Sequence, residues 1–267
     1  MDQIKFLHIM KTNFIIAAAL FCLCLSSFAQ EKTYPAPEPM RPGMSEYWTP
    51  QPKVVTPGDI LINTAPSDAI VLFDGKDLSK WESSKGGDPA WKVADGVMTV
   101  SKEKGSGDIR TKETFGSFQL HLEWRVPEDI EGSNQARGNS GVFLQGMYEI
   151  QILDNYINET YVNGMVGSVY KQSPPLVNAM RRPGEWNVYD IIYTAPVFNP
   201  DGTYLYRPRV TLLHNGVVVQ NNVEILGTTE YIGFPKVRPH GDGPIGLQMH
   251  GDPSKPISFR NIWIRRL

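Results

Sequence analysis

Alternation of apolar and polar residues is the dominant pattern of the chain after residue 67. It is clearest in SFQLHLEWRVP, VFLQGMYEIQIL, WNVYDIIYTAP and ISFRNIWIRRL, and no segment there keeps a helical period of 3.6 residues. The dipeptides Asp95-Gly96 and Asn215-Gly216 each separate two such stretches, where they favour two-residue hairpin turns. Many short antiparallel strands over about 200 residues predict an all-β fold, a two-sheet antiparallel jelly-roll sandwich without a long helix.

Three of the predicted strands have one apolar face and one face of long polar side chains. Residues two apart along a strand share a face. The polar rows are His121, Glu123 and Arg125, then Glu149 and Gln151, and finally Gln248 and His250. A solvated outer face is the ordinary explanation of one such row, but these rows contain no Lys. Glutamine and histidine beside carboxylates are typical of a ligand-binding groove, so we predict that the last two rows line one pocket.

The first 67 residues differ in composition from the rest of the chain. Lys5 and Lys11 precede the apolar run 14–25, and small residues follow at Ser27 and Ala29. This layout predicts a signal peptide over residues 1–29 and export to the periplasm or the extracellular space. The run is too short for a comfortable membrane span, so no transmembrane segment is expected.

Residues 30–67 are rich in proline and show neither a strand nor a helix period. We interpret them as an extended linker or as a wrap around the following domain, residues 68–267. Tyr47 and Trp48 could pin this segment to that domain.

Charge and cysteine usage narrow the function. The formal net charge is −2 and no basic block is present, so a nucleic-acid partner is not expected. Both cysteines, Cys22 and Cys24, fall inside the predicted signal peptide. The chain that remains after cleavage can therefore form neither a disulfide nor a Cys-ligated zinc site.

The order of eight motifs carries a resemblance to a known family. These are LFDGKDLSKW, WKVADGVM, TKETFGSFQLHLEWRVP, GNSGVFLQGMYEIQILDN, GSVYKQSPP, PGEWNVYDI, HNGVVV and IGLQMHG followed by ISFRNIWIRRL. Residues 68–267 resemble the 3-keto-disaccharide hydrolase family, whose members are concanavalin-like jelly rolls of secreted proteins. The resemblance implies an enzyme that cleaves glycosides oxidised to a ketone at C3, and a carbohydrate partner.

The resemblance also implies what the site must contain. A ketone at C3 acidifies the hydrogen at C2, so one base can remove it and the substituent at C1 can leave by elimination, with water adding afterwards. Glu149 is our candidate for the base and His250 for the proton donor, and the two could instead ligate a divalent metal ion. Arg125 is a candidate for holding the enolate. No cofactor other than such a metal is expected.

The remaining candidate site residues are assigned to substrate binding. They are Gln151, Gln248, Arg125, Glu123, Asp154, Tyr170 and Trp186. Glu123 and Arg125 could also pair with each other, and Trp186 could belong to the core. The sequence carries no signal for the oligomeric state.

Two other functions stay open. Residues 142–154 also resemble the active strand of laminarinase-type retaining glucanases, with Glu149 at the first carboxylate and Gln151 in place of the middle aspartate. A glucanase needs two carboxyl groups about 5–5.5 Å apart, so Asp154 would have to reach the Glu149 face. A non-catalytic carbohydrate-binding module would depend on exposed Trp or Tyr platforms instead.

Overall fold

The computed structural model describes residues 38–52, 54 and 65–267. The strands in this part of the chain are β1 (Ile70–Phe73), β2 (Trp81–Ser83), β3 (Lys92–Ala94), β4 (Val97–Thr99), β5 (Ile109–Thr111), β6 (Phe118–Arg125), β7 (Ser140–Leu144), β8 (Tyr148–Ile152), β9 (Asn187–Thr194), β10 (Val197–Phe198), β11 (Tyr204–Tyr206), β12 (Arg209–His214), β13 (Val217–Glu224), β14 (Gly246–Leu247) and β15 (Ser258–Arg266).

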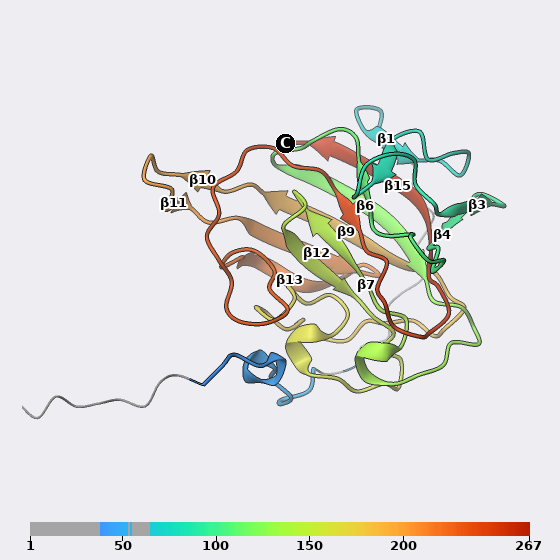
Figure 1. The fold of residues 1–267 in the computed structure, drawn as a ribbon, viewed down its shortest axis with the longest axis horizontal. Helices are drawn as coiled ribbons and strands as arrows, with labels where there is room; N and C mark the ends of the chain where they lie inside the picture. Colours follow the sequence, from blue (N-terminus) through green and yellow to red (C-terminus); the bar gives the residue numbers. More distant parts are fainter. Residues whose placement is uncertain (1–37, 53, 55–64) are drawn as a thin grey trace, which may run out of the picture. The chain divides into compact units, whose positions relative to one another are not determined.

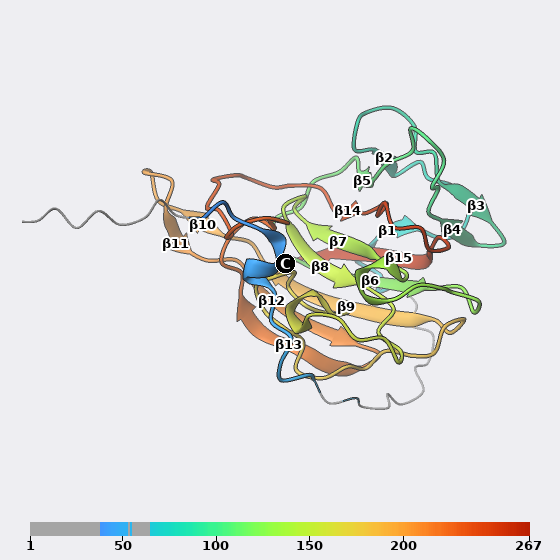
Figure 2. The ribbon, with the colours of Figure 1, turned by 60° about the horizontal axis from the view of Figure 1, so that its bottom comes forward.

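These strands form two main antiparallel sheets, seen as two layers in Figure 2. The larger sheet has eight strands in the order β13-β12-β9-β6-β15-β4-β3, with β1 also paired to β15. The smaller sheet has five, in the order β2-β5-β14-β7-β8. The pair β10 and β11 projects as a separate ribbon (Figure 1). The predicted all-β sandwich is therefore confirmed.

Both predicted hairpins are present. Asp95 and Gly96 join β3 to β4 with φ values of 52° and 76°, and Asn215 and Gly216 join β12 to β13 with φ values of 54° and 78°. Two successive positive φ angles are the signature of the turn that matches strand twist.

The space between the two sheets is filled by the apolar rows. From β6, the side chains of Leu120, Leu122 and Trp124 are at most 1% exposed, and they meet Tyr148, Ile150 and Ile152 of β8. Alternation then places Glu149 and Gln151 on the other face of the five-stranded sheet.

Helical structure is limited to three 3₁₀ segments in the described residues, η1 (Pro42–Ser45), η2 (Asn134–Ala136) and η3 (Val162–Gly164). No helix among residues 38–52, 54 and 65–267 is long and apolar enough to cross a membrane. The predicted signal peptide, residues 1–29, lies outside the described residues.

The polar row of β6 was predicted to contribute Glu123 and Arg125 to the substrate groove, but it lies elsewhere. Glu123 is 3% exposed and accepts hydrogen bonds from Arg260 Nε (2.5 Å) and Asn261 (2.8 Å). The guanidinium groups of Arg260 and Arg125 lie over the Trp186 ring, 4.1 and 4.6 Å from its centroid. Because β6 belongs to the eight-stranded sheet, Glu123 and Arg125 lie on the face of that sheet that is turned away from the core. Glu123, Arg125 and Trp186, which the sequence assigned to substrate binding, are therefore not among the residues that line the cavity of Glu149.

His121 completes this structural cluster. Its Nδ1 lies 2.7 Å from Asp190, its Nε2 lies 3.8 Å from Glu123, and its ring stacks on Trp263. Burial opposes the charged imidazolium, but the two carboxylates outweigh it and raise the pKa of His121 to about 9. In turn, burial of Glu123 is outweighed by hydrogen bonds from His121, Asn261 and Arg260, so that its pKa falls to about 2.

We expect His121 to stabilise the fold in a pH-dependent way. Its contribution is fully present below the unfolded pKa of about 6.5 and is lost as pH rises through about 9, because only the folded state retains the proton in that window. Urea unfolding of the wild type and of His121→Gln at pH 6, 7.5 and 9 would measure this. The difference in unfolding free energy should shrink with pH, and a constant difference would contradict the assignment.

Candidate active site

A cavity of about 550 Å³ lies against the polar face of the five-stranded sheet. Side chains of β7 and β8 form its floor, and loops from several parts of the chain form its walls. The lining residues are Glu46, Asn134, Gln135, Asn139, Phe143, Glu149, Gln151, Tyr161, Tyr170, Thr229, Tyr231, Gln248 and His250. The predicted meeting of Glu149, Gln151, Gln248 and His250 in one pocket is therefore confirmed, and Tyr170 joins them.

The pairing of three strands explains this meeting. Gly141 of β7 lies opposite Gln151 of β8, and on its other side its carbonyl accepts a hydrogen bond from the Gln248 N–H (3.0 Å). Gln151 and Gln248 therefore flank a position without a side chain. A Cβ on Gly141 would overlap the Glu149 carboxylate and lie 2.9 Å from its Cγ. The Glu149 side chain thus lies directly over the backbone of residue 141, which only glycine allows.

Glu149 carries an unusual carboxyl group. It is 4% exposed, and among the described residues no cation pairs with it. Burial, with a smaller repulsion from Asp108, raises the pKa of Glu149 to about 8. Its backbone N–H donates to Thr229 Oγ1 (2.9 Å), which fixes the strand at this residue. Perturbed carboxyls of this kind in a cavity are typical of catalytic acids and bases.

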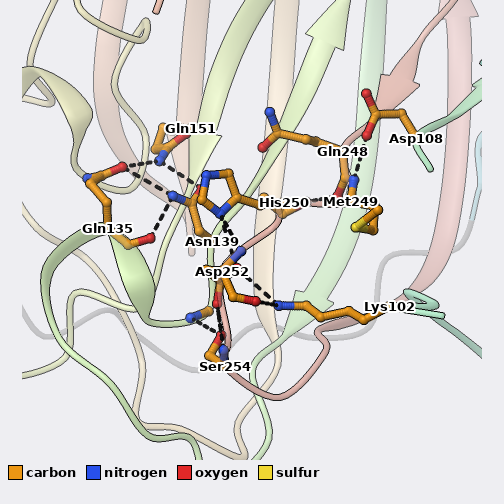
Figure 3. Close-up of polar contacts among 12 residues, drawn as sticks. Lys102, Asp108, Gln135, Asn139, Gln151, Gln248, Met249, His250, Asp252 and Ser254 are labelled. Carbon is orange, nitrogen blue, oxygen red and sulfur yellow. Dashed lines mark hydrogen bonds and ion pairs between the residues drawn. The ribbon is translucent and has the colours of Figure 1, made fainter. Parts of the chain in front are cut away.

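Three amide side chains form a cluster beside Glu149. Gln151 contacts Gln135 and Asn139 at 3.1 and 3.2 Å, and Asn139 also donates to the Gln135 carbonyl at 2.9 Å (Figure 3). With its amide nitrogen turned toward Glu149, Gln151 donates to that carboxylate (3.3 Å) and to the Ser140 carbonyl (3.2 Å). These groups supply donors and acceptors of the kind that sugar hydroxyls require.

Gln248 adds a free acceptor. Its Oε1 is buried and has no hydrogen-bond partner in the described part of the chain. A buried polar atom without a partner is costly, and here it lines the cavity. A hydroxyl of a bound ligand would satisfy it.

His250 is held by a buried aspartate that the sequence did not reveal (Figure 3). Asp252 Oδ2 lies 3.1 Å from His250 Nδ1 and 3.0 Å from Lys102 Nζ, and the same carboxylate binds Ser254. Burial would raise the pKa of Asp252, but these hydrogen bonds lower it to about 2, so it stays ionised. When Nδ1 carries a proton, it donates to Asp252 Oδ2 and Nε2 is left for the cavity; without that proton, Nδ1 instead accepts the Asp252 backbone N–H, 3.2 Å away. The spacing His-x-Asp was the only available sequence signal.

Two tyrosines complete the walls. The hydroxyls of Tyr161 and Tyr170 are 2.6 Å apart, and the Tyr170 backbone N–H donates to the Glu149 carbonyl (3.1 Å). Burial raises the pKa of both hydroxyls, so they stay protonated. Since one donates to the other, one O–H proton of the pair is available to a ligand.

Asp154 does not reach this cavity. It is fully buried, with Oδ2 2.7 Å from Arg137 Nε, and its Oδ1 accepts the Tyr156 N–H. Asp154 lies beyond the end of β8, and its pairing with Arg137 holds its carboxylate away from that of Glu149. The structure therefore places Asp154, a predicted substrate-binding residue, outside this cavity.

The described residues do not gather the acidic, histidine or cysteine ligands that a metal ion needs. Among the described residues, no group of three or more His, Cys, Asp or Glu lies close enough together to hold a metal ion. Glu149 and His250, the predicted ligands, would thus have no third ligand of these types in the described structure.

The fold, the polar cavity and the comparisons with known proteins define a carbohydrate-acting jelly-roll protein. The chain belongs to the family described as the 3-keto-alpha-glucoside-1,2-lyase-like domain, whose model matches residues 68–265. The predicted family is therefore confirmed. No curated protein matches the sequence.

Solved structures support this assignment. A candidate glycosyl hydrolase from Parabacteroides distasonis is 67% identical, with a TM-score of 0.76 over 84% of this chain and 96% of that one. Two further candidate glycosyl hydrolases from the same organism are 21% and 24% identical, each with a TM-score of 0.52 over 74% of this chain and over 94% and 99% of theirs. The latter two show the same fold.

We expect replacement of the Glu149 carboxyl to stabilise the fold at high pH. The folded pKa of about 8 exceeds the unfolded value of 4.5, so ionisation costs stability as pH rises between these values, by up to about 1.4 kcal/mol per pH unit. Glu149→Gln should match the wild type at pH 4.5 and exceed it increasingly up to pH 8 in urea unfolding. Glu131→Gln, at an exposed glutamate, is the control. A pH-independent difference for Glu149→Gln would contradict the raised pKa.

Proposed function

We propose that the protein cleaves 3-keto-glycosides by eliminating the substituent at C1. The observation that carries this proposal is one buried carboxyl with a pKa of about 8 in a polar cavity that also holds an aspartate-bound histidine. Elimination needs one base and one acid, and these are the two groups present. Family membership supports the same chemistry.

Glu149 acts as the base. Its carboxylate takes the proton from C2, and the electrons of the broken C–H bond form a C2–C3 double bond with the negative charge on the C3 oxygen. A base of raised pKa is better matched to a weak carbon acid than an ordinary carboxylate is. Burial thus strengthens Glu149 for this step, while lowering the fraction ionised at neutral pH.

His250 acts as the acid. As the C3 ketone reforms, a double bond develops between C1 and C2 and the C1–O bond breaks. His250 in its imidazolium form gives its Nε2 proton to the departing oxygen, while ionised Asp252 stabilises that charged form. Water can then add to the unsaturated product, which would complete a net hydrolysis.

The enolate oxygen needs a donor other than the predicted one. Arg125 lies over Trp186 on the other sheet and does not line the cavity. The protonated Tyr161–Tyr170 pair is the alternative within the cavity, because its free O–H can donate to the developing oxyanion. The amide of Gln151 and the Oε1 of Gln248 are available to the ring hydroxyls.

The other two functions find less support. A retaining glucanase would use Asp154 as the second carboxylate, and Asp154 is bound to Arg137 away from the cavity. A binding module would rely on exposed aromatic platforms. Of the three tyrosines in the lining, Tyr161 and Tyr170 are buried and bound to each other, so Tyr231 is the one exposed tyrosine ring beside the amides and carboxyls.

We expect turnover of a 3-keto-glucoside and none of the parent glucoside, because only the ketone acidifies the C2 hydrogen. Glu149→Gln should reduce kcat by roughly 10²–10⁴-fold with little change in ligand affinity, since the amide keeps the shape and loses the basicity. The wild-type kcat/KM profile should be bell-shaped, with one limb set by the ionisation of Glu149 near pH 8 and the other by loss of the proton that His250 donates. Comparable cleavage of the parent glucoside, or an active Glu149→Gln, would refute the mechanism.

Asp252→Asn should lower kcat more than it changes KM. The amide cannot stabilise the imidazolium and no longer selects the Nδ1 proton, so the protonated form of His250 that donates to the leaving oxygen becomes less stable and less well oriented. Substrates with activated leaving groups, such as nitrophenyl 3-keto-glucoside, need less protonation and should recover most of the loss. Equal losses on activated and unactivated substrates would argue for a purely structural role of Asp252.

A further inference from the structure

The Pro-rich segment before the family domain contributes to the cavity. Glu46 lines the cavity, although the family match begins only at residue 68. We call residues 40–52 the N-terminal strap. It contains η1 (Pro42–Ser45), and Glu46 follows directly.

One buried asparagine holds the strap on both sides of Glu46. Asn163 is 0% exposed, donates its Nδ2 proton to the Ser45 carbonyl (2.9 Å) and accepts the Tyr47 N–H at its Oδ1 (3.1 Å). The Trp48 and Tyr161 rings pack in a T-shaped arrangement, with their centroids 6.2 Å apart. A side chain bracketed in this way is pre-organised, and Glu46 does not have to order itself when a ligand binds.

A buried lysine connects the strap to the walls of the cavity. The side chain of Lys171 is 3% exposed, and its Nζ donates to the carbonyls of Pro42 (3.1 Å) and Tyr231 (2.9 Å). It lies 3.4 Å from Glu46 Oε1 and over the Tyr231 ring at 4.8 Å. Burial lowers the pKa of Lys171, and Glu46 opposes that shift. The Lys171 ammonium is therefore buried behind the residues that line the cavity, and the Glu46 carboxylate balances its charge.

We propose that Glu46 is a specificity-determining residue that selects neutral sugars. Its carboxylate accepts hydrogen bonds from sugar hydroxyls, and it repels substrates that carry a carboxylate of their own. No Lys or Arg is among the lining residues, so the cavity offers an acidic substrate no lysine or arginine partner, and Glu46 adds a carboxylate there. Hydrogen bonds to a charged acceptor are about twice as strong as neutral ones, which suits recognition of adjacent hydroxyls. This inference rests on the proposed function for the identity of the reacting ring.

The test compares full-length wild type with Glu46→Gln and Glu46→Asp. The substrates are a neutral 3-keto-disaccharide and its two analogues that carry a carboxylate at C6 of either ring. Glu46→Gln should raise KM for the neutral substrate by roughly tenfold, change kcat less than twofold, and reduce the preference for neutral over acidic substrate. Glu46→Asp keeps the charge and should retain that preference. Glu131→Gln, at an exposed glutamate, should behave as wild type.

Two further measurements separate the possible failures. Melting temperatures of all variants show whether a change in KM reflects a lost contact or a disordered strap, and Glu46→Ala, which also removes the charge, provides the test if Glu46→Gln does not fold. Calorimetric titration with the unoxidised neutral and uronic disaccharides reports binding without turnover. Inactive wild type toward every 3-keto-glycoside would refute the proposed function alone. Unchanged KM and an unchanged ratio of neutral to acidic affinities in Glu46→Gln would overturn the role of Glu46.

Discussion

The site depends on a single carboxyl group that is buried without a cation in the part of the chain that the structure describes. Glu149 lies over Gly141 on the outer face of the five-stranded sheet, and its neighbours are amides, a hydroxyl and another acid. Burying an ionised carboxylate in this way is costly, so its proton is retained to higher pH. The surrounding structure has to tolerate this cost, and it does so through a fixed backbone and a rigid layer of amides.

The rest of the site follows from that constraint. A side chain at residue 141 would displace the carboxylate, so the neighbouring strand position must be glycine. The proton donor has the opposite requirement, because its charged form must be stabilised. Asp252 stabilises that form of His250, and Lys102 in turn binds the Asp252 carboxylate. The strap then adds Glu46 and the balanced charge of Lys171. The charge state of each of these ionisable groups thus depends on the groups that contact it.

Sequence alternation predicted the strands and their faces but not the sheet to which each strand belongs. The apolar rows of β6 and β8 meet in the core as expected, and Glu149, Gln151, Gln248 and His250 share a cavity. The polar row of β6 looked the same in sequence, yet that strand pairs with β9 and β15 in the other sheet. Strand pairing is decided by long-range contacts, which a period of two residues does not encode. Asp252 and Glu46 were missed for the same reason, since only folding brings them to the site.

Comparison of two buried glutamates shows what separates a structural carboxylate from a reactive one. Glu123 and Glu149 are 3% and 4% exposed, and both lie on a polar face of a strand. Glu123 is bound by Arg260, Asn261 and His121, and its pKa falls to about 2. Glu149 has burial and Asp108 acting in the same direction, and its pKa rises to about 8. Similar solvent exposure therefore accompanies opposite shifts, because Glu149 lies deeper in the protein and lacks the hydrogen-bond donors and the guanidinium that bind Glu123. A carboxylate that already accepts several hydrogen bonds binds a proton weakly, whereas Glu149 retains the basicity that proton abstraction requires.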